Sequence, residues 1–296
     1  MPPETPAGDR EATLLAHLEA QPREANGHLE LAFLYYQTAR FEAAFEAIAR
    51  SLALNSGAAA AYQLLGLILG ALGQPAYAAR AFEASLALEP DNETARHCLQ
   101  ACRQQPATGA LPADRSARVE RLLEARTPTL SACLIVKDEA ENLPRCLESV
   151  RDWVSEIVVV DTGSTDGTVA IAESFGARVH HFDWCDDFSA ARNFSLAHAT
   201  GDWVLVIDAD ETLVVDDPAA FRWALHQRAC AGYITVRHDW RSSEETDKVL
   251  VLRLFQRHAR IRFAGHLHEN VGTAIAELGW PIGQLETIAL RHAGAS

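Results

Sequence analysis

The feature that most constrains the fold is an internal repeat in the first third of the sequence. Residues 31–55 align with residues 65–89 at an offset of 34 residues, and leucine and alanine recur at matching positions in both copies. A unit of this length does not bury its apolar face alone, so neighbouring units stack into a solenoid. The pattern predicts paired helices over about residues 10–104, with residues 92–104 as the closing helix.

The repeat resembles the tetratricopeptide repeat (TPR), with small residues where two helices touch and a turn at Gly73-Gln74-Pro75. This resemblance implies a concave surface on which a peptide can lie. A scaffold that only stabilises or dimerises the neighbouring domain is the alternative. The flanking segments are interpreted as a disordered N-terminus at residues 1–9 and a linker at residues 105–128 that contains a short helix.

Composition and charge disfavour several classes of function. The formal net charge is −14, which disfavours nucleic acid or anionic lipid as a partner because both require a basic surface. The N-terminus lacks the features of a secretory signal, and the most apolar window falls inside the helical repeat, so no transmembrane segment is expected. The six cysteines form no CxxC pair, which favours a reduced, cytoplasmic compartment.

From residue 129 onward, strands are expected to alternate with helices. The runs LSACLIV, EIVVV, ARVHHF and DWVLVI are apolar or β-branched and predict strands, and the segments between them have helical spacing. This alternation predicts an α/β domain with a mostly parallel sheet over residues 129–296. Ligands of such open sheets bind beyond the carboxyl ends of the strands, so the residues there are the candidate site.

Carboxylates follow two of these strands. EIVVV is followed by DTGSTDGT, which contains Asp161 and Asp166. An acid in this position can accept hydrogen bonds from a nucleobase or a ribose hydroxyl, although Asp166 alone is better explained as a helix cap. DWVLVI is followed by Asp208 and Asp210, hard oxygen ligands that suit Mg²⁺ or Mn²⁺. The two carboxylates point to opposite faces in a regular strand, but a turn at the strand end can bring both to one site.

Four segments, in this order, resemble family 2 glycosyltransferases with the GT-A fold: CLIVKDEAENLPRCLESV, EIVVVDTGSTDGT, FSAARNFSLAHATGDWVLVIDADE and FAGHLHENV. The resemblance is strongest to a subgroup that includes lipopolysaccharide-core glucosyltransferase-like enzymes. The fusion to helical repeats is also similar to peptide S-glycosyltransferases. The resemblance implies inverting transfer from a nucleoside-diphosphate sugar, most often UDP-linked, with a divalent metal (Mn²⁺ or Mg²⁺) as cofactor.

The resemblance also implies roles for individual residues. Arg192 either pairs with a phosphate or braces the acidic strand ends. Asp138 stands where this subgroup usually has Asn, and Asp210 is favoured over Asp208 as the direct metal ligand. The residues expected to bind the donor nucleotide are Val136, Lys137, Glu139, Asp161, Asp166, Arg192, Asn193 and Asp208.

An inverting displacement needs a general base that removes a proton from the acceptor nucleophile. The segment FAGHLHENV supplies the candidates, with Glu269 as the expected base, His268 close to the metal or diphosphate, and His266 packed in the loop. His292 is a further candidate metal ligand, and an ordinary surface role is the alternative for each histidine. Zinc is not expected, because no cysteine or third histidine lies nearby at metal spacing. The predicted metal ligands are Asp210, Asp208, His268 and His292.

The acidic loop WCDDF precedes the AARN segment. Asp187 is expected to cap the following helix, whereas Trp184 either stacks on a sugar or packs against protein.

These observations favour a metal-dependent glycosyltransferase whose acceptor is a protein or peptide recruited by the repeats. A saccharide or lipid-linked acceptor, with the repeats docking a partner enzyme, is one alternative. A catalytically inactive adaptor is another, and the presence of Asp161, Asp208, Asp210 and Glu269 argues against it.

Overall fold

The protein is described by a computed structural model that covers residues 7–106, 111–124, 127–240, 246–265 and 269–292. The chain divides into two compact units, a helical unit of Met1–Thr127 with His226–Ala229 and an α/β unit of Pro128–Leu225 with Cys230–Ser296. Within the described ranges, no helix combines the length and the apolar character needed to cross a membrane.

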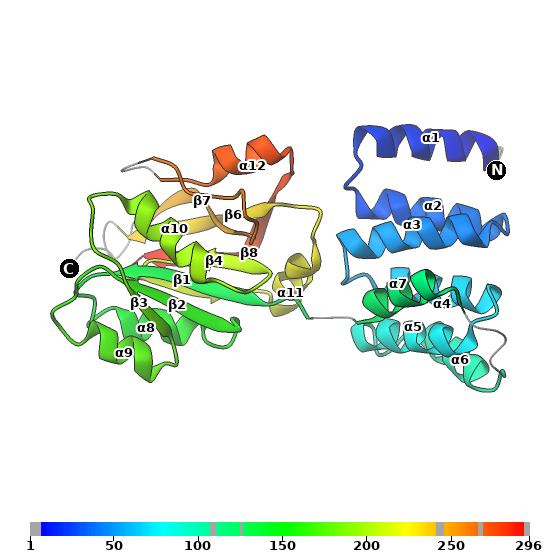
Figure 1. The fold of residues 1–296 in the computed structure, drawn as a ribbon, viewed down its shortest axis with the longest axis horizontal. Helices are drawn as coiled ribbons and strands as arrows, with labels where there is room; N and C mark the ends of the chain where they lie inside the picture. Colours follow the sequence, from blue (N-terminus) through cyan, green and yellow to red (C-terminus); the bar gives the residue numbers. More distant parts are fainter. Residues whose placement is uncertain (1–6, 107–110, 125–126, 241–245, 266–268, 293–296) are drawn as a thin grey trace. The chain divides into compact units, whose positions relative to one another are not determined.

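The helical unit contains antiparallel helix pairs (Figure 1). Its first helix begins at Ala7, inside the segment predicted as disordered, and Thr13 Oγ1 donates to the carbonyl oxygen of Asp9 within its first turns. Residues 1–6 lie outside the described residues. The helices are α1 (Ala7–Ala20), α2 (Ala25–Gln37), α3 (Phe41–Leu54), α4 (Ala59–Ala71), α5 (Pro75–Leu88), α6 (Glu93–Arg103) and α7 (Ala113–Leu123).

The repeat of 34 residues is visible as matching hydrogen bonds. Ser51 Oγ donates to the carbonyl oxygen of Ala25 at 2.9 Å, and the equivalent Ser85 Oγ donates to that of Ala59 at 3.0 Å. Each bond ties the second helix of a pair to the start of the first. Both serines are buried, so each bond satisfies a hydroxyl that would otherwise lose its water partners. The predicted helix pairs and closing helix are confirmed.

The predicted short helix in the linker is α7, and it packs on α3 and α5. Val119 is fully buried in the apolar core of the helical unit, and Tyr77 and Ser116 share a hydrogen bond of 2.7 Å between their hydroxyls. The segment is therefore part of the helical unit, because its amphipathic face finds an apolar surface to cover.

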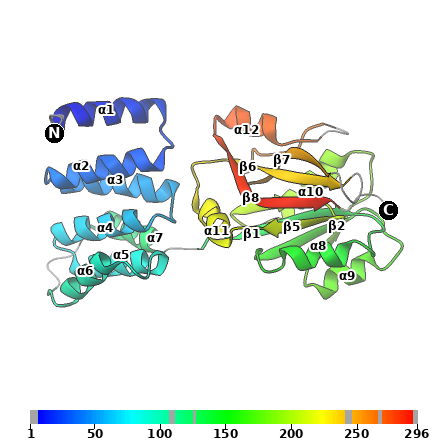
Figure 2. The ribbon, with the colours of Figure 1, turned by 180° about the vertical axis from the view of Figure 1, so that it is seen from behind.

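The α/β unit contains one sheet of eight strands in the order β3-β2-β1-β4-β7-β6-β8-β5 (Figure 2). The strands are β1 (Leu130–Val136), β2 (Glu156–Asp161), β3 (Arg178–His181), β4 (Trp203–Val206), β5 (Glu211–Val215), β6 (Gly232–Trp240), β7 (Thr246–Gln256) and β8 (Ile282–His292). The helices are α8 (Leu143–Val150), α9 (Thr168–Ser174), α10 (Phe188–His198), α11 (Pro218–His226) and α12 (Gly272–Leu278).

Apolar side chains cover both faces of the sheet. Leu134 of β1 belongs to the core that contains α8, whereas its neighbour Cys133 belongs to the core that contains Leu196 of α10 and Ile275 of α12. Strands buried on both faces read as continuous apolar runs, as the sequence of β1 does.

The predicted fold class, an α/β domain preceded by an all-α repeat unit, is confirmed. The four predicted strands are β1 to β4, and they are parallel to one another. Beyond them the sheet is mixed, since β7 is antiparallel to β4 and β6 is antiparallel to β7. The sequence analysis did not identify β5 to β8, although β6 and β7 carry residues of the site described below.

Candidate active site

Two loops meet at the carboxyl ends of β1 and β2. Asp138 Oδ1 accepts from the backbone nitrogen of Thr165 at 2.7 Å, and Asp166 Oδ2 accepts from that of Ala140 at 3.1 Å. Asp138 has a φ of 54°, in the left-handed region that Asp and Asn tolerate better than most residues. The Asp in place of the usual Asn therefore preserves the backbone geometry of this loop.

The predicted nucleotide-binding residues of these two loops have different surroundings. Val136 is buried at the end of β1, and Lys137 is exposed. Glu139 Oε2 accepts from Asn142 at 3.0 Å, just before α8. Asp166 Oδ1 accepts from the backbone nitrogen of Thr168 at 2.9 Å, so this carboxylate serves the start of α9, as its interpretation as a cap predicts.

Asp161 is the last residue of β2 and is 3% exposed. Burial alone would raise the pKa of its carboxyl, but hydrogen bonds from Ser164 and Gly163 outweigh burial and hold that pKa below its usual value. His181 Nδ1 lies 3.3 Å from Oδ2. A buried carboxylate that stays ionised at a strand end is a strong acceptor for a hydroxyl or an imide N–H.

Asp208 follows β4 and is held by two arginines. Its Oδ1 accepts from Arg192 Nη2 at 2.8 Å, and its Oδ2 accepts from Arg253 Nη2, also at 2.8 Å. Burial would raise the pKa of this carboxyl, but the two guanidinium groups hold it well below its ordinary value. Both oxygens of Asp208 therefore already have cationic partners.

Arg192 lies at the centre of the site and is 5% exposed. Besides Asp208 it contacts Glu269, whose Oε1 accepts from Arg192 Nε at 2.8 Å. Burial disfavours its charge, but Asp208 and Glu269 keep the pKa of the guanidinium raised. Its Nη1 is buried and has no hydrogen-bond partner among the described residues. The two N–H groups of this nitrogen thus have no acceptor within the described part of the chain.

Glu211 is completely buried behind Asp208. Its Oε2 accepts from the backbone nitrogen of Asp208 at 3.0 Å, while its Oε1 lies 3.8 Å from Arg237 Nη1 and 3.9 Å from Arg253 Nη2. Burial and the nearby Asp208 raise the pKa of the Glu211 carboxyl. Glu211 stands at the end of the turn that follows β4 and accepts from the backbone nitrogen of Asp208 at its beginning, so the side chain stabilises this turn.

Asp210 has a different partner. Its Oδ2 lies 2.9 Å from His292 Nε2 at the end of β8, and the two side chains are 33% and 31% exposed. Among the described residues, no group of three or more His, Cys, Asp or Glu side chains has the arrangement of a metal site. The third predicted ligand, His268, lies with His266 outside the described residues. A carboxylate is a ligand type that suits Mn²⁺ and Mg²⁺.

Asn193 supports the segment that carries Glu269. Its Nδ2 donates to the carbonyl oxygen of Phe263 at 2.9 Å, and its Oδ1 accepts from the backbone nitrogen of Phe263 at 2.8 Å. On the same helix Ser189 Oγ donates to the carbonyl oxygen of Gly265 at 2.5 Å. The structure therefore gives Asn193 a positioning contact with protein backbone, beside its predicted role toward the nucleotide.

The loop before α10 confirms the predicted cap. Asp187 Oδ1 accepts from the backbone nitrogen of Ala190 at 3.0 Å. Trp184 is 37% exposed, packs edge to face on Phe188 and donates to Asp186 Oδ1 at 2.8 Å. Trp184 thus packs against protein on one side and keeps part of its ring exposed.

Arg253 and Arg237 were not predicted from the sequence, and no role was predicted for Glu211. Arg253 is an internal residue of β7 and Arg237 an internal residue of β6. The available signal was an arginine inside the apolar runs VLVLRLF and YITVR, since a charged residue within a strand usually has a buried partner.

Residues 131–275 match the family model described as glycosyl transferase family 2. This part of the chain is a family 2 glycosyltransferase domain. The match covers β1, β2 and β4 with the carboxylates at their ends, together with α10 and the Glu269 segment.

Two curated relatives and one solved structure show the extent of the similarity. A TPR repeat-containing protein from Synechococcus elongatus is 44% identical over 177 residues, covering 58% of this chain and 44% of the relative. The glycosyltransferase SunS from Bacillus subtilis is 41% identical over 86 residues, covering 28% of this chain and 20% of SunS. The chain therefore spans less than half the length of either relative.

The crystal structure of S. aureus TarS residues 1–349 in complex with UDP-GlcNAc matches with a TM-score of 0.45 at 18% identity, over 57% of this chain and 60% of that one.

Proposed function

We propose that this chain transfers a sugar from a UDP-linked donor to a peptide acceptor, with inversion and with a divalent metal. The observation that carries the proposal is that the two aspartates after β4 of this family 2 domain have different partners. Asp208 is neutralised by two arginines, whereas the one ion pair of Asp210 within the described part of the chain is with His292, and Asp210 remains partly exposed. Asp210 is thus the carboxylate after β4 that is best placed to receive a cation.

The donor is proposed to lie across the ends of β1, β2 and β4. Asp161 would accept hydrogen bonds from the nucleoside, and Nη1 of Arg192, which lacks a partner among the described residues, would donate to the diphosphate. Asp210 and His292 would hold Mn²⁺ or Mg²⁺. When bound, the metal neutralises charge on the departing diphosphate.

Glu269 is proposed as the general base. Its Oε1 is engaged by Arg192, and among the described residues no donor bonds to its Oε2. Its side chain is 14% exposed, so the carboxylate is positioned by the guanidinium and still reachable. The Oε2 atom would accept the proton of the acceptor nucleophile as the new glycosidic bond forms.

The acceptor is proposed to bind to the first helices of the repeat pairs. A groove of about 360 Å³ lies between α2 and α4 of the helical unit, and Phe33 on its edge is 43% exposed. Its lining residues are mostly apolar: Leu29, Glu30, Phe33, Ala60, Gln63, Leu64 and Leu67. A peptide with apolar side chains fits such a lining, and Glu30 favours a basic residue beside them.

The proposal is tested by thermal unfolding of the full chain with UDP, GDP and a panel of their sugars, in Mn²⁺ or in EDTA. A ligand at about one hundred times its Kd adds roughly 2.7 kcal/mol of stability. We expect a Mn²⁺-dependent shift with a UDP-linked sugar and its loss in Asp210→Asn. Asp152→Asn is the matched control, because Asp152 is exposed and lies before β2, at the other end of that strand.

Absence of a shift with every donor would contradict the proposal and would favour an adaptor role. If donor binding and hydrolysis are found, mass spectrometry of the products distinguishes a glycosylated peptide from a glycosylated saccharide or lipid.

A further inference from the structure

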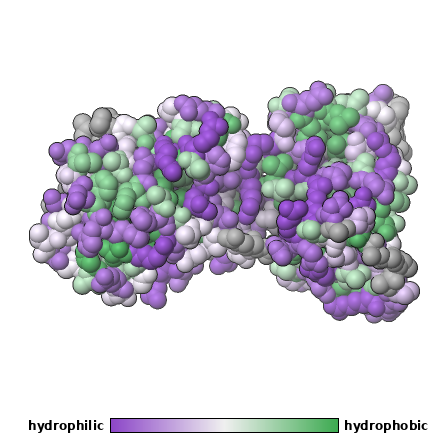
Figure 3. All heavy atoms as spheres, in the orientation of Figure 1, coloured by the Kyte–Doolittle hydropathy of each residue, from purple (hydrophilic) through white to green (hydrophobic). Residues whose placement is uncertain are grey.

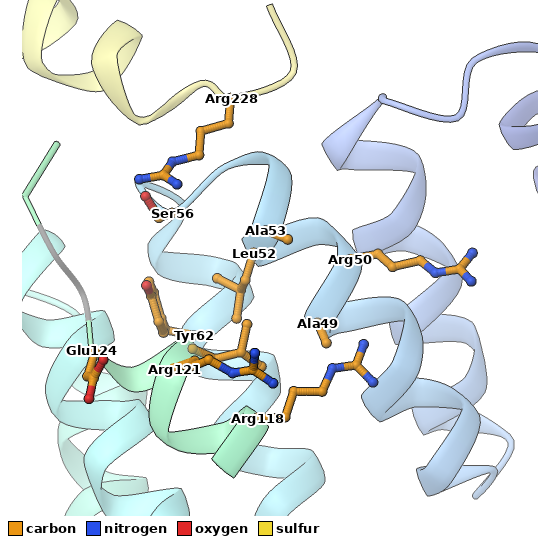
Figure 4. A pocket seen from close by; sticks show the side chains of 11 residues that line it. Ala49, Arg50, Leu52, Ala53, Ser56, Tyr62, Arg118, Arg121, Glu124 and Arg228 are labelled. Carbon is orange, nitrogen blue, oxygen red and sulfur yellow. The ribbon is translucent and has the colours of Figure 1, made fainter. Parts of the chain in front are cut away.

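The helical unit has a second cavity, of about 430 Å³, between α3, α7 and the loop that contains Arg228 (Figure 4). It is separate from the groove between α2 and α4, since the two share no lining residue. Its floor is largely apolar and includes Leu52, Tyr62 and Leu122. Its charged lining consists of one carboxylate, Glu124, and the guanidinium groups of Arg50, Arg118, Arg121 and Arg228.

The charge of this cavity is opposite to that of the chain, whose net charge is −14. Figure 3 shows that hydrophilic side chains gather over α3 and α7, whereas hydrophobic ones gather over α1. Like charges gathered on one surface repel, so they need counter-charges from the protein or from a ligand. The described residues supply such counter-charges to only some of these arginines.

The neutralisation is partial. Arg118 pairs with Glu46 at 2.6 Å on the rim, whereas the hydrogen bond of Arg121 to a described residue is with the carbonyl oxygen of Ala117 in its own helix, at 3.3 Å. Arg50 is exposed and forms no ion pair with a described residue. Figure 4 shows Arg118 and Arg121 extending from α7 toward α3. These guanidinium groups therefore retain donors for an added anion.

Arg228 contributes from the side of the cavity that contains Tyr62. Burial raises the pKa of the Tyr62 hydroxyl, and the charge of Arg228 opposes this rise, so the guanidinium lies close enough to be felt at the phenol. Basic side chains therefore border the apolar floor from α7 and from the loop that contains Arg228. A ligand that matches both features carries negative charge next to an apolar group.

We propose that this cavity binds an acidic polypeptide segment, with an apolar side chain on Ala53 and Leu122 and carboxylates on the arginine rim. Arg guanidinium groups suit carboxylates because their planar donors bond both oxygens. A nucleic acid fits less well, because the floor offers apolar surface and a sugar–phosphate backbone has no apolar side chain to place on it. The site is independent of glycosyl transfer, since none of its residues belongs to the α/β unit.

The test uses the full chain and a fluorescein-labelled hexapeptide of four glutamates and two leucines, followed by fluorescence anisotropy. The same peptide with glutamine in place of glutamate is the charge control. We expect saturable binding of the acidic peptide that weakens with added salt, and weaker binding of the glutamine peptide.

The variant Arg50→Gln/Arg121→Gln should bind the acidic peptide roughly fivefold to tenfold more weakly, the loss of two solvent-accessible charge pairs. Arg10→Gln/Arg145→Gln is the matched control, because both of these arginines are exposed, lie outside the cavity and produce the same change in net charge. Circular dichroism melting of both variants confirms that α7 and the repeats remain folded.

Three outcomes overturn the proposal. The acidic and glutamine peptides bind equally, or the control variant loses as much affinity as the cavity variant. In the third, a single-stranded oligonucleotide displaces the peptide at lower concentration than an unlabelled copy does, which would make nucleic acid the better ligand.

Discussion

The helix α4 contains two glycines one turn apart that should respond to alanine in opposite directions. A Cβ atom added to Gly66 would lie 2.7 Å from Cζ of Phe82, and 2.8 and 2.9 Å from its two Cε atoms. A Cβ atom added to Gly70 would meet no heavy atom within 4 Å. Both glycines are in the same helix, Gly66 in its interior and Gly70 in its last turn, where the intrinsic cost of glycine is at most that of the interior.

The magnitude follows from two opposing terms. Replacing glycine by alanine inside a helix stabilises it by about 1 kcal/mol. At Gly66 this gain is offset by overpacking, which costs about 1–3 kcal/mol, because the ring of Phe82 is 1% exposed and has no room to move away. Gly70→Ala should therefore gain about 1 kcal/mol, and Gly66→Ala should lose about 1 kcal/mol, a difference of about 2 kcal/mol.

The assay is thermal unfolding of the full chain followed by far-ultraviolet circular dichroism. The helical unit is longer than 100 residues, so 1 kcal/mol should shift its Tm by roughly 3–5 °C, and the two variants should still be separated. A Gly66→Ala protein that melts with or above Gly70→Ala would refute the reasoning, since it would mean that Phe82 does not constrain this position.

A second substitution isolates the contact. In the preceding repeat the equivalent positions hold Ala32 and Ile48, both fully buried, so the double variant Gly66→Ala/Phe82→Ile recreates a pair that the protein already packs. Phe82→Ile alone should lose stability through a cavity. We expect the double variant to lose less than the sum of the two single losses, with a coupling of about 1 kcal/mol.

Three further predictions concern the candidate active site. Arg253→Met leaves Asp208 with one cationic partner and should lower the free energy of unfolding by about 2–3 kcal/mol at pH 7, as measured by urea unfolding. Because the arginines lower the pKa of Asp208, this difference between wild type and variant should shrink as pH falls below about 4. Glu211→Gln removes a carboxyl whose pKa is raised, and the wild type therefore loses stability as pH rises above the usual Glu pKa. The Tm of the variant relative to the wild type should thus rise from about pH 4 to about pH 8. A difference in Tm that stays constant over this range would contradict the prediction. If His292 acts with Asp210 as a metal ligand, His292→Asn should weaken Mn²⁺ binding about tenfold, as measured by calorimetry. The Tm of the variant in EDTA should equal that of the wild type.

The parts of the fold that the sequence predicted are those with a local signal. Helices α2 to α6 repeat their small and apolar residues at a fixed interval, and strands β1 to β4 are short apolar runs between helices of regular spacing. Each of these elements buries a face that its own sequence defines. The predicted helix α7 had such a face as well, but its surface on α3 and α5 is formed only in the folded unit.

Strands β6 and β7 lacked a comparable signal. They pair antiparallel with a register shift between Tyr233 and Ile234, and β6 also pairs with β8. Their positions depend on partners distant in sequence, so alternation within each strand does not specify where they lie. Arg253 and Arg237 were missed for the same reason, since an arginine in a strand becomes part of a site only through the neighbouring strand that brings it there.

The spacing of Asp208 and Asp210 shows what the sequence left open. Side chains at i and i+2 after a strand can either share one site or diverge, and both carboxylates were predicted to hold the metal. In the structure Asp208 contacts Arg192 and Arg253, whereas Asp210 contacts His292. These contacts come from side chains of α10, β7 and β8, so the divergence of the two carboxylates is a property of the sheet rather than of the motif.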